Sequence, residues 1–156
     1  MLMPKKTKYR KVHKGTLAGR SKGARTVAFG DYGLVAVEPS RVTARQIESV
    51  RVTINRKIKK VGKSFLRMFP DKPVTKKPAE TRMGKGKGNP EFWVAVVKRG
   101  RVILELGGGL SKEEAKAILT AAAYKLPMKT KFVCKEDYNL EVALQVQGGL
   151  NQDGAV

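Results

Sequence analysis

Apolar residues between positions 44 and 61 recur every three or four residues, which predicts an amphipathic helix. Its apolar stripe consists of Ile47, Val50, Ile54, Ile58 and Val61. Thr43 and Gln46 form the pattern of a capping box at the start, and Gly62 is a natural C-terminal stop. The remaining faces carry six Lys or Arg residues against one acid, Glu48. The sequence therefore predicts a basic helix with one face in the core.

A second helix is expected after Ser111, which forms another capping box with Glu114. Its apolar stripe runs to about residue 126, and Pro127 ends it. Strands are expected in the β-prone stretches 64–69, 91–97, 101–106 and 129–133, with two short strands inside 26–38. The turn at residues 98–100 predicts that 91–97 and 101–106 form a hairpin. These elements predict an α+β fold, a two-layer sandwich of a mainly antiparallel or mixed sheet with two helices on one face.

Three segments lack the patterning of a packed core. Residues 1–25 hold nine Lys or Arg residues and no acid, which predicts an extended arm that orders on a partner. Residues 70–90 contain three early prolines and then a Gly/Lys run, which is typical of a long functional loop. Residues 134–156 hold one Lys and four acids and are expected to form a flexible, weakly acidic tail. A single α/β domain is expected at residues 26–133.

The distribution of charge along the chain indicates a binding partner. The formal net charge of the 156-residue chain is +20. Residues 1–100 hold 26 of the 33 Lys and Arg residues and only 6 of the 13 acids. Like charges repel in a compact domain, so the excess favours a polyanionic partner, RNA or DNA.

The candidate nucleic-acid contacts follow from this distribution. The Gly/Lys run combines glycines, whose backbone amides can approach phosphates, with interleaved cations. It comprises Arg82, Met83, Gly84, Lys85, Gly86, Lys87 and Gly88. The candidates in the arm and around the first helix are Lys5, Lys6, Lys8, Arg10, Lys11, His13, Lys14, Arg45, Arg51, Arg56, Lys57, Lys59, Lys60 and Lys63. A solvated tail and a solvated loop are the alternative interpretations of these segments.

No pattern of catalytic or metal-binding residues emerges. Cys134 is the lone cysteine, which excludes zinc binding through paired cysteines, and His13 has no partner at a recognisable spacing. Val61-Gly62-Lys63-Ser64 looks like the end of a phosphate-binding P-loop. That pattern requires a glycine at position 57, which is Lys57 here, and it must follow a strand and open a helix, whereas this stretch ends a helix. An RNA-modifying or RNA-processing enzyme stays an alternative that would need a cofactor pocket or paired acid–base groups. A free RNA chaperone or a binder of anionic membranes is a third.

Four stretches in order resemble the bacterial and organellar large-subunit ribosomal protein sixteen family. They are MPKKTKYRKVHKG (3–15), TARQIE (43–48), FPDKPVTKKP followed by RMGKGKG (69–88), and AAYKLPMKTKFV (122–133). The resemblance covers about residues 1–133 and implies an α/β sandwich and a structural role rather than an enzymatic one.

The resemblance also implies a place and partners. Members lie below the central protuberance of the large subunit, bind 23S-type rRNA and help form the aminoacyl-tRNA site. It implies that the loop Arg82–Gly88 points toward A-site tRNA, with P-site tRNA as a further contact, and that the arm and the basic helix grip rRNA. The expected partners are rRNA, tRNA and neighbouring ribosomal proteins, with no cofactor, metal, membrane, DNA or second copy of the chain. The expected location is the ribosome in a bacterial cytoplasm, with an organellar ribosome as the alternative.

Overall fold

The computed structural model describes residues 2–58 and 62–150 of the chain, and it confirms the α+β class. In chain order, the elements are β1 (Tyr32–Ala36), β2 (Ser40–Thr43), α1 (Ala44–Ile58), β3 (Lys63–Leu66), β4 (Lys72–Lys76), β5 (Asn89–Val97), β6 (Val102–Gly107), α2 (Lys112–Ala123), β7 (Thr130–Cys134) and α3 (Lys135–Leu150). The expected residues 59–61 of the first helix lie outside the described part.

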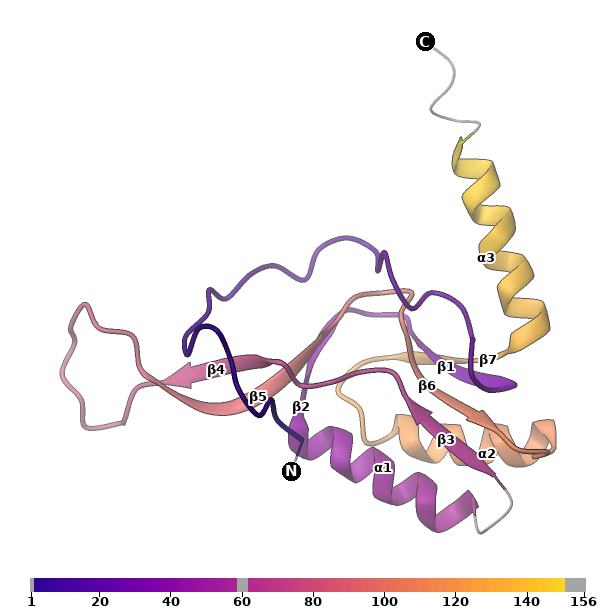
Figure 1. Cartoon of the computed structure of the whole chain (residues 1–156), viewed down its shortest axis with the longest axis horizontal. Helices are drawn as coiled ribbons and strands as arrows, with labels where there is room; N and C mark the ends of the chain where they lie inside the picture. Colours follow the sequence, from indigo (N-terminus) through magenta and orange to yellow (C-terminus); the bar gives the residue numbers. More distant parts are fainter. Residues whose placement is uncertain (1, 59–61, 151–156) are drawn as a thin grey trace.

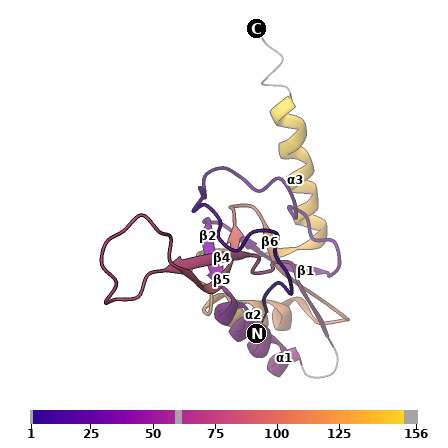
Figure 2. The same ribbon diagram turned by 60° about the vertical axis from the view of Figure 1, so that its left-hand side comes forward.

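Two antiparallel sheets replace the expected single sheet. The strand order is β3-β6-β1-β7 in the four-stranded sheet and β2-β5-β4 in the three-stranded sheet. Helices α1 and α2 lie together on one side, and the N-terminal segment crosses the other side (Figures 1 and 2). Most of the arm therefore lies on the face opposite α1 and α2, but its first residues, Leu2 and Met3, lie beside the start of α1 (Figure 1).

The core lies between the helix pair and the sheets. Ile47, Val50 and Ile54 of α1 are fully buried, as are Leu119 of α2 and Leu106 of β6. Burying one such side chain contributes about 1.5–3 kcal/mol before the entropy of ordering it is counted. Both predicted capping boxes are present, since each N-cap side chain accepts from the third helical amide and the returning side chain accepts from the N-cap amide.

The predicted hairpin is wrong, because β5 and β6 belong to different sheets. The Gly100 amide donates to the Ala36 carbonyl (2.7 Å), and the Ala36 amide donates to the Arg101 carbonyl (2.9 Å). These bonds direct the chain after the turn to β1. The turn therefore joins the two sheets, and β5 pairs with β2 and β4 instead.

Two further predictions about strands are corrected. Of the two strands expected in residues 26–38, only β1 forms. The backbone before β1 directs its amides to the side chain of Glu105 in β6 instead of to a neighbouring strand. The prolines of 70–78 were expected to bar regular structure, yet Pro73 lies within β4. That strand is at the edge of its sheet, where one side of the backbone needs no partner and a missing N–H is tolerated. The loop is shortened to residues 77–88.

The segment expected to be a tail begins as a packed helix. Cys134 ends β7, and residues 135–150 form α3, which projects away from the sheets (Figure 1). Val142 is buried and Tyr138 packs against the cluster of Val27, Val35, Val102 and Val133. The expected flexibility of residues 134–156 stays a prediction, but the first turns of α3 belong to the folded body.

Candidate nucleic-acid interface

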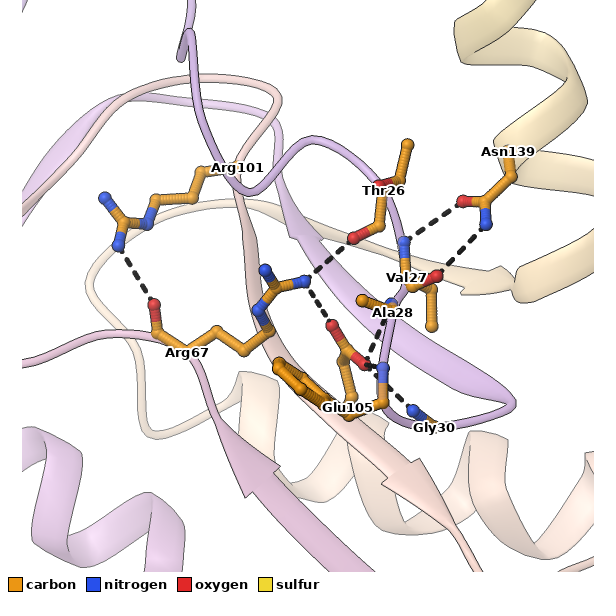
Figure 3. Close-up of polar contacts among 9 residues, drawn as sticks. Thr26, Val27, Ala28, Gly30, Arg67, Arg101, Glu105 and Asn139 are labelled. Carbon is orange, nitrogen blue, oxygen red and sulfur yellow. Dashed lines mark hydrogen bonds and ion pairs between the residues drawn. The ribbon is translucent and has the colours of Figure 1, made fainter.

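The base of the arm is held by a buried carboxylate. Glu105 of β6 is fully buried, and its Oε2 accepts the backbone amides of Ala28, Phe29 and Gly30 at 3.1, 2.6 and 2.9 Å (Figure 3). Its Oε1 lies 2.5 Å from the Arg67 guanidinium, which also donates to the carbonyl of Thr26 (2.9 Å). We call these contacts the arm anchor. They fix the point where the arm meets the four-stranded sheet.

The charge of Glu105 is stabilised by its partners despite its burial. Burial alone would raise the pKa of this carboxyl group. The Arg67 guanidinium and the amides of Gly30, Phe29 and Ala28 outweigh it and hold the pKa below its ordinary value. Glu105 is therefore ionised at neutral pH, and its role is to hold the backbone rather than to transfer a proton.

Helix α3 adds a second attachment at the same place. The side-chain amide of Asn139 accepts from the Val27 N–H and donates to the Val27 carbonyl, both at 3.0 Å (Figure 3). This pair imitates the hydrogen bonding of a neighbouring strand. Val27 is buried, so its two backbone groups need these partners. The arm is thus attached to both β6 and α3.

Farther toward the N-terminus, the arm lies against the three-stranded sheet. Arg41 of β2 donates to the carbonyls of Lys14 and Gly15 at 3.0 and 3.2 Å. Lys72 of β4 also donates to the Lys14 carbonyl. Gly15 has a φ of +66°, which only glycine adopts without strain. Cations of the sheet therefore hold the arm through its backbone and leave the arm's own side chains exposed.

The arm and the Gly/Lys loop contact each other through two lysines. The Lys11 ammonium donates to the Lys87 carbonyl (2.7 Å), and the Lys87 ammonium donates to the Val12 carbonyl (2.6 Å). At the base of the loop, a Cβ on Gly88 would collide with the backbone of Lys76 and Lys77. Two segments that are more than 70 residues apart are thus combined into one surface, which we call the arm–loop surface (residues 5–14 and 82–88).

The charge of the arm–loop surface is not neutralised by other residues in the described part of the chain. Lys11 and Lys87 donate to carbonyl oxygens, which carry no net charge. Within the described residues, no Lys or Arg of the surface forms an ion pair with a carboxylate; the ion pairs there involve Arg51, Arg67, Lys129 and Lys131. All seven arm candidates and the loop cations are exposed. Such a surface attracts anions over a range set by the ionic strength.

The helix candidates lie elsewhere. Arg45, Arg56 and Lys57 are exposed on α1, and Lys63 is exposed at the start of β3. Arg51 makes a bidentate contact with Glu48, and this hydrogen bonding lowers the pKa of Glu48. Lys59 and Lys60 lie outside the described residues. Arg45, at the start of α1, lines a cleft with Leu2 and Met3 of the arm, whereas Arg56 and Lys57 lie in the last turn of that helix and form a second surface.

Sequence reasoning missed the residues that hold the arm. Arg41 and Lys72 lie within strands and carry no distinguishing motif. Glu105 did carry a signal, because it is a single acid inside the apolar run Val102–Leu106. A charged residue at a fully buried strand position is rarely tolerated without partners, so this pattern favours a buried ion pair.

Other chemistry has little structural support in the described part of the chain. There, no group of three or more His, Cys, Asp or Glu side chains is arranged to hold a metal ion. None of the helices in the described residues has the length and apolar character needed to cross a bilayer.

Comparison with known proteins identifies the family of the chain. A family model for ribosomal protein L16p/L10e matches residues 4–133. The large ribosomal subunit protein uL16 of Heliobacterium modesticaldum is 54% identical over 137 residues, which cover 88% of this chain and 94% of that protein. The family is one of structural ribosomal proteins, and membership implies association with rRNA and other ribosomal components. The resemblance seen in the sequence is confirmed: the chain belongs to the ribosomal protein L16p/L10e family.

Proposed function

We propose that the chain binds large-subunit rRNA through the arm and the basic face of α1, and that its loop Arg82–Gly88 helps form the aminoacyl-tRNA site. The observation that carries this proposal is the reciprocal contact of Lys11 and Lys87, which joins arm and loop into one cationic surface. RNA phosphates would supply the anions that the described residues do not provide there.

The two surfaces suit different tasks. The arm is held by its backbone, so its side chains are free to reach phosphates from a fixed position. The exposed cations in the last turn of α1, Arg56 and Lys57, lie away from the start of the arm and would contact a second region of rRNA. The loop projects beyond the sheets (Figure 1), and Gly84 and Gly86 have open space around them, so an RNA backbone can approach closely. A tRNA contact is therefore assigned to the loop, with the A site as its expected place and the P site as a further one.

Binding to refolded large-subunit rRNA should weaken steeply with salt. Each neutralised phosphate contributes about 0.7–0.9 units to the slope of log K against log salt concentration. Replacing Lys5, Lys6 and Lys8 with glutamine should flatten that slope by about two units, because counterion release is lost at three contacts. Filter binding across a salt series measures the slope.

A charge-matched control separates contact from general attraction. Lys112, Lys116 and Lys125 are exposed cations at α2, outside both proposed surfaces. Their replacement with glutamine (the control variant) removes the same charge and should change the slope much less. Equal slopes for the two triple variants would contradict the assignment of the arm.

A further inference from the structure

A second cationic site lies where the end of the arm meets α3. A cleft of about 250 Å³ opens between the arm, the β5–β6 connection, β7 and α3. Four of its lining residues are cations from three separate parts of the chain, Arg20, Arg25, Arg99 and Lys131. Glu141 is the one carboxylate among the described lining residues. Arg20 and Arg25 belong to the basic arm predicted from the sequence, but none of the four cations was named there as an individual contact.

Backbone hydrogen bonds hold the arginines in place. The Ser21 amide donates to the Arg99 carbonyl (3.0 Å), and the Val102 amide donates to the Ala24 carbonyl (2.7 Å). Between these bonds the arm turns, with Ala24 at a φ of 53°. Arg20 and Arg25 therefore flank a turn that is fixed against the connection carrying Arg99. These backbone hydrogen bonds hold the arginines near one another despite their mutual repulsion, and within the described residues none of the three forms an ion pair with a carboxylate.

The opposite wall comes from β7 and α3. Lys131 pairs in register with Val35 of β1, and its ammonium lies 3.9 Å from Glu141 Oε2, at the long limit for an ion pair. Both side chains are exposed, so this contact neutralises little. Tyr138 also lines the cleft. Burial raises the pKa of its phenol, partly offset by Arg25, so at neutral pH it keeps its proton and can donate a hydrogen bond.

We infer that this cleft binds a phosphate group of large-subunit rRNA, and that Glu141 is the internal anion which the phosphate displaces. Arginine guanidinium groups bind phosphate through paired hydrogen bonds, and three of them converge here. Arg20 and Arg25, at the C-terminal end of the arm, line the cleft, so an RNA strand that follows the arm would reach it. The inference rests on the proposed rRNA binding and adds a contact at the C-terminal end of the arm.

The test is rebinding of the full chain to large ribosomal subunits from which this protein has been removed by a salt wash. A cleft variant carries Arg20→Gln, Arg25→Gln and Arg99→Gln. It should bind about tenfold more weakly than the control variant at physiological salt, with a salt slope lower by at least about one unit. Glu141→Gln should instead bind two- to fivefold more tightly than the wild type, because Lys131 loses its internal anion and the cleft loses its one carboxylate among the described lining residues.

The outcomes separate this inference from the function on which it rests. Failure of the wild type to rebind would overturn the proposed function itself. Wild-type rebinding, with the cleft variant equal to the control variant, would overturn the inference alone. A cleft variant that is weak on subunits but normal on protein-free rRNA would assign the cleft to an acidic protein neighbour.

Folding of the variants is a separate readout. Urea unfolding of each variant shows whether a loss of rebinding reflects a damaged arm. Glu141→Gln changes an exposed side chain and should leave stability within about 0.5 kcal/mol of the wild type. Unchanged affinity of this variant would contradict the displacement of Glu141 whatever the cleft variant does.

Discussion

Replacing Glu105 with alanine is expected to lower the free energy of unfolding by about 3–5 kcal/mol. The substitution leaves the Arg67 guanidinium without its buried partner and three amides of the arm anchor without an acceptor. Glu105→Gln keeps the shape but places an NH₂ group against these donors, so its loss should be smaller. Trp93 is the only tryptophan, and its fluorescence during urea unfolding gives the free energies.

The pH dependence of stability gives a second check on the ion pair between Glu105 and Arg67. Because the folded-state pKa of Glu105 lies below its ordinary value of about 4.3, its ionised form stabilises the fold above that value. This contribution is lost as the pH falls through the folded-state pKa. The stability difference between the wild type and Glu105→Gln should be constant near neutral pH and should narrow below about pH 4.

A control variant at an exposed acid tests whether the loss of stability comes from the arm anchor or from the removal of any carboxylate. Glu91 is exposed on β5, and its replacement with alanine should change stability by less than about 0.5 kcal/mol. If Glu105→Ala is no less stable than Glu91→Ala, the arm anchor does not contribute as described. Gly30→Ala is a further variant of the anchor, since a Cβ there would collide with the Leu106 carbonyl.

Replacing Lys85 with alanine should weaken binding of aminoacyl-tRNA to the A site about tenfold, with little effect on incorporation of the protein into subunits. This factor corresponds to loss of about one hydrogen bond to a charged group. In the described structure Lys85 is exposed and makes no hydrogen bond or ion pair with the rest of the chain. Its charge is therefore available to tRNA.

Lys87→Ala is the informative comparison, because Lys87 also holds Val12 of the arm. We expect this variant to reduce both tRNA binding and incorporation into subunits. Filter binding of tRNA to purified variant ribosomes measures the first effect, and the protein content of salt-washed subunits measures the second. Normal tRNA affinity in both variants would contradict the assignment of the loop to the A site.

Local chemistry explains which elements could be predicted from the sequence. Helices α1 and α2 have apolar stripes and capping boxes whose contacts lie within four residues, so their signals are complete in a short window. The β5–β6 turn also had a local signal, but strand pairing depends on which distant backbone is nearest, and here β1 and β2 are nearer. Pro73 was misjudged because edge position is a property of the whole sheet.

The candidate site shows the same limit. The cations of the arm and loop could be identified from composition, because exposed charge needs no partner to be recognised. Their union through Lys11 and Lys87 could not, since it depends on a contact between residues 76 positions apart. The start of α3 was predicted to be a tail because its sequence is polar. In the structure, the polar side chain of Asn139 forms two hydrogen bonds with the backbone of Val27.

The most direct test of the central claim is sedimentation of a gently lysed extract of the source cells, followed by a wash at moderate salt, below the concentration that strips the protein from the subunit. The account predicts that the chain sediments with the large subunit and that most of it stays there after a moderate wash, because many phosphate contacts act together. Recovery of the chain near the top of the gradient before any wash would contradict it.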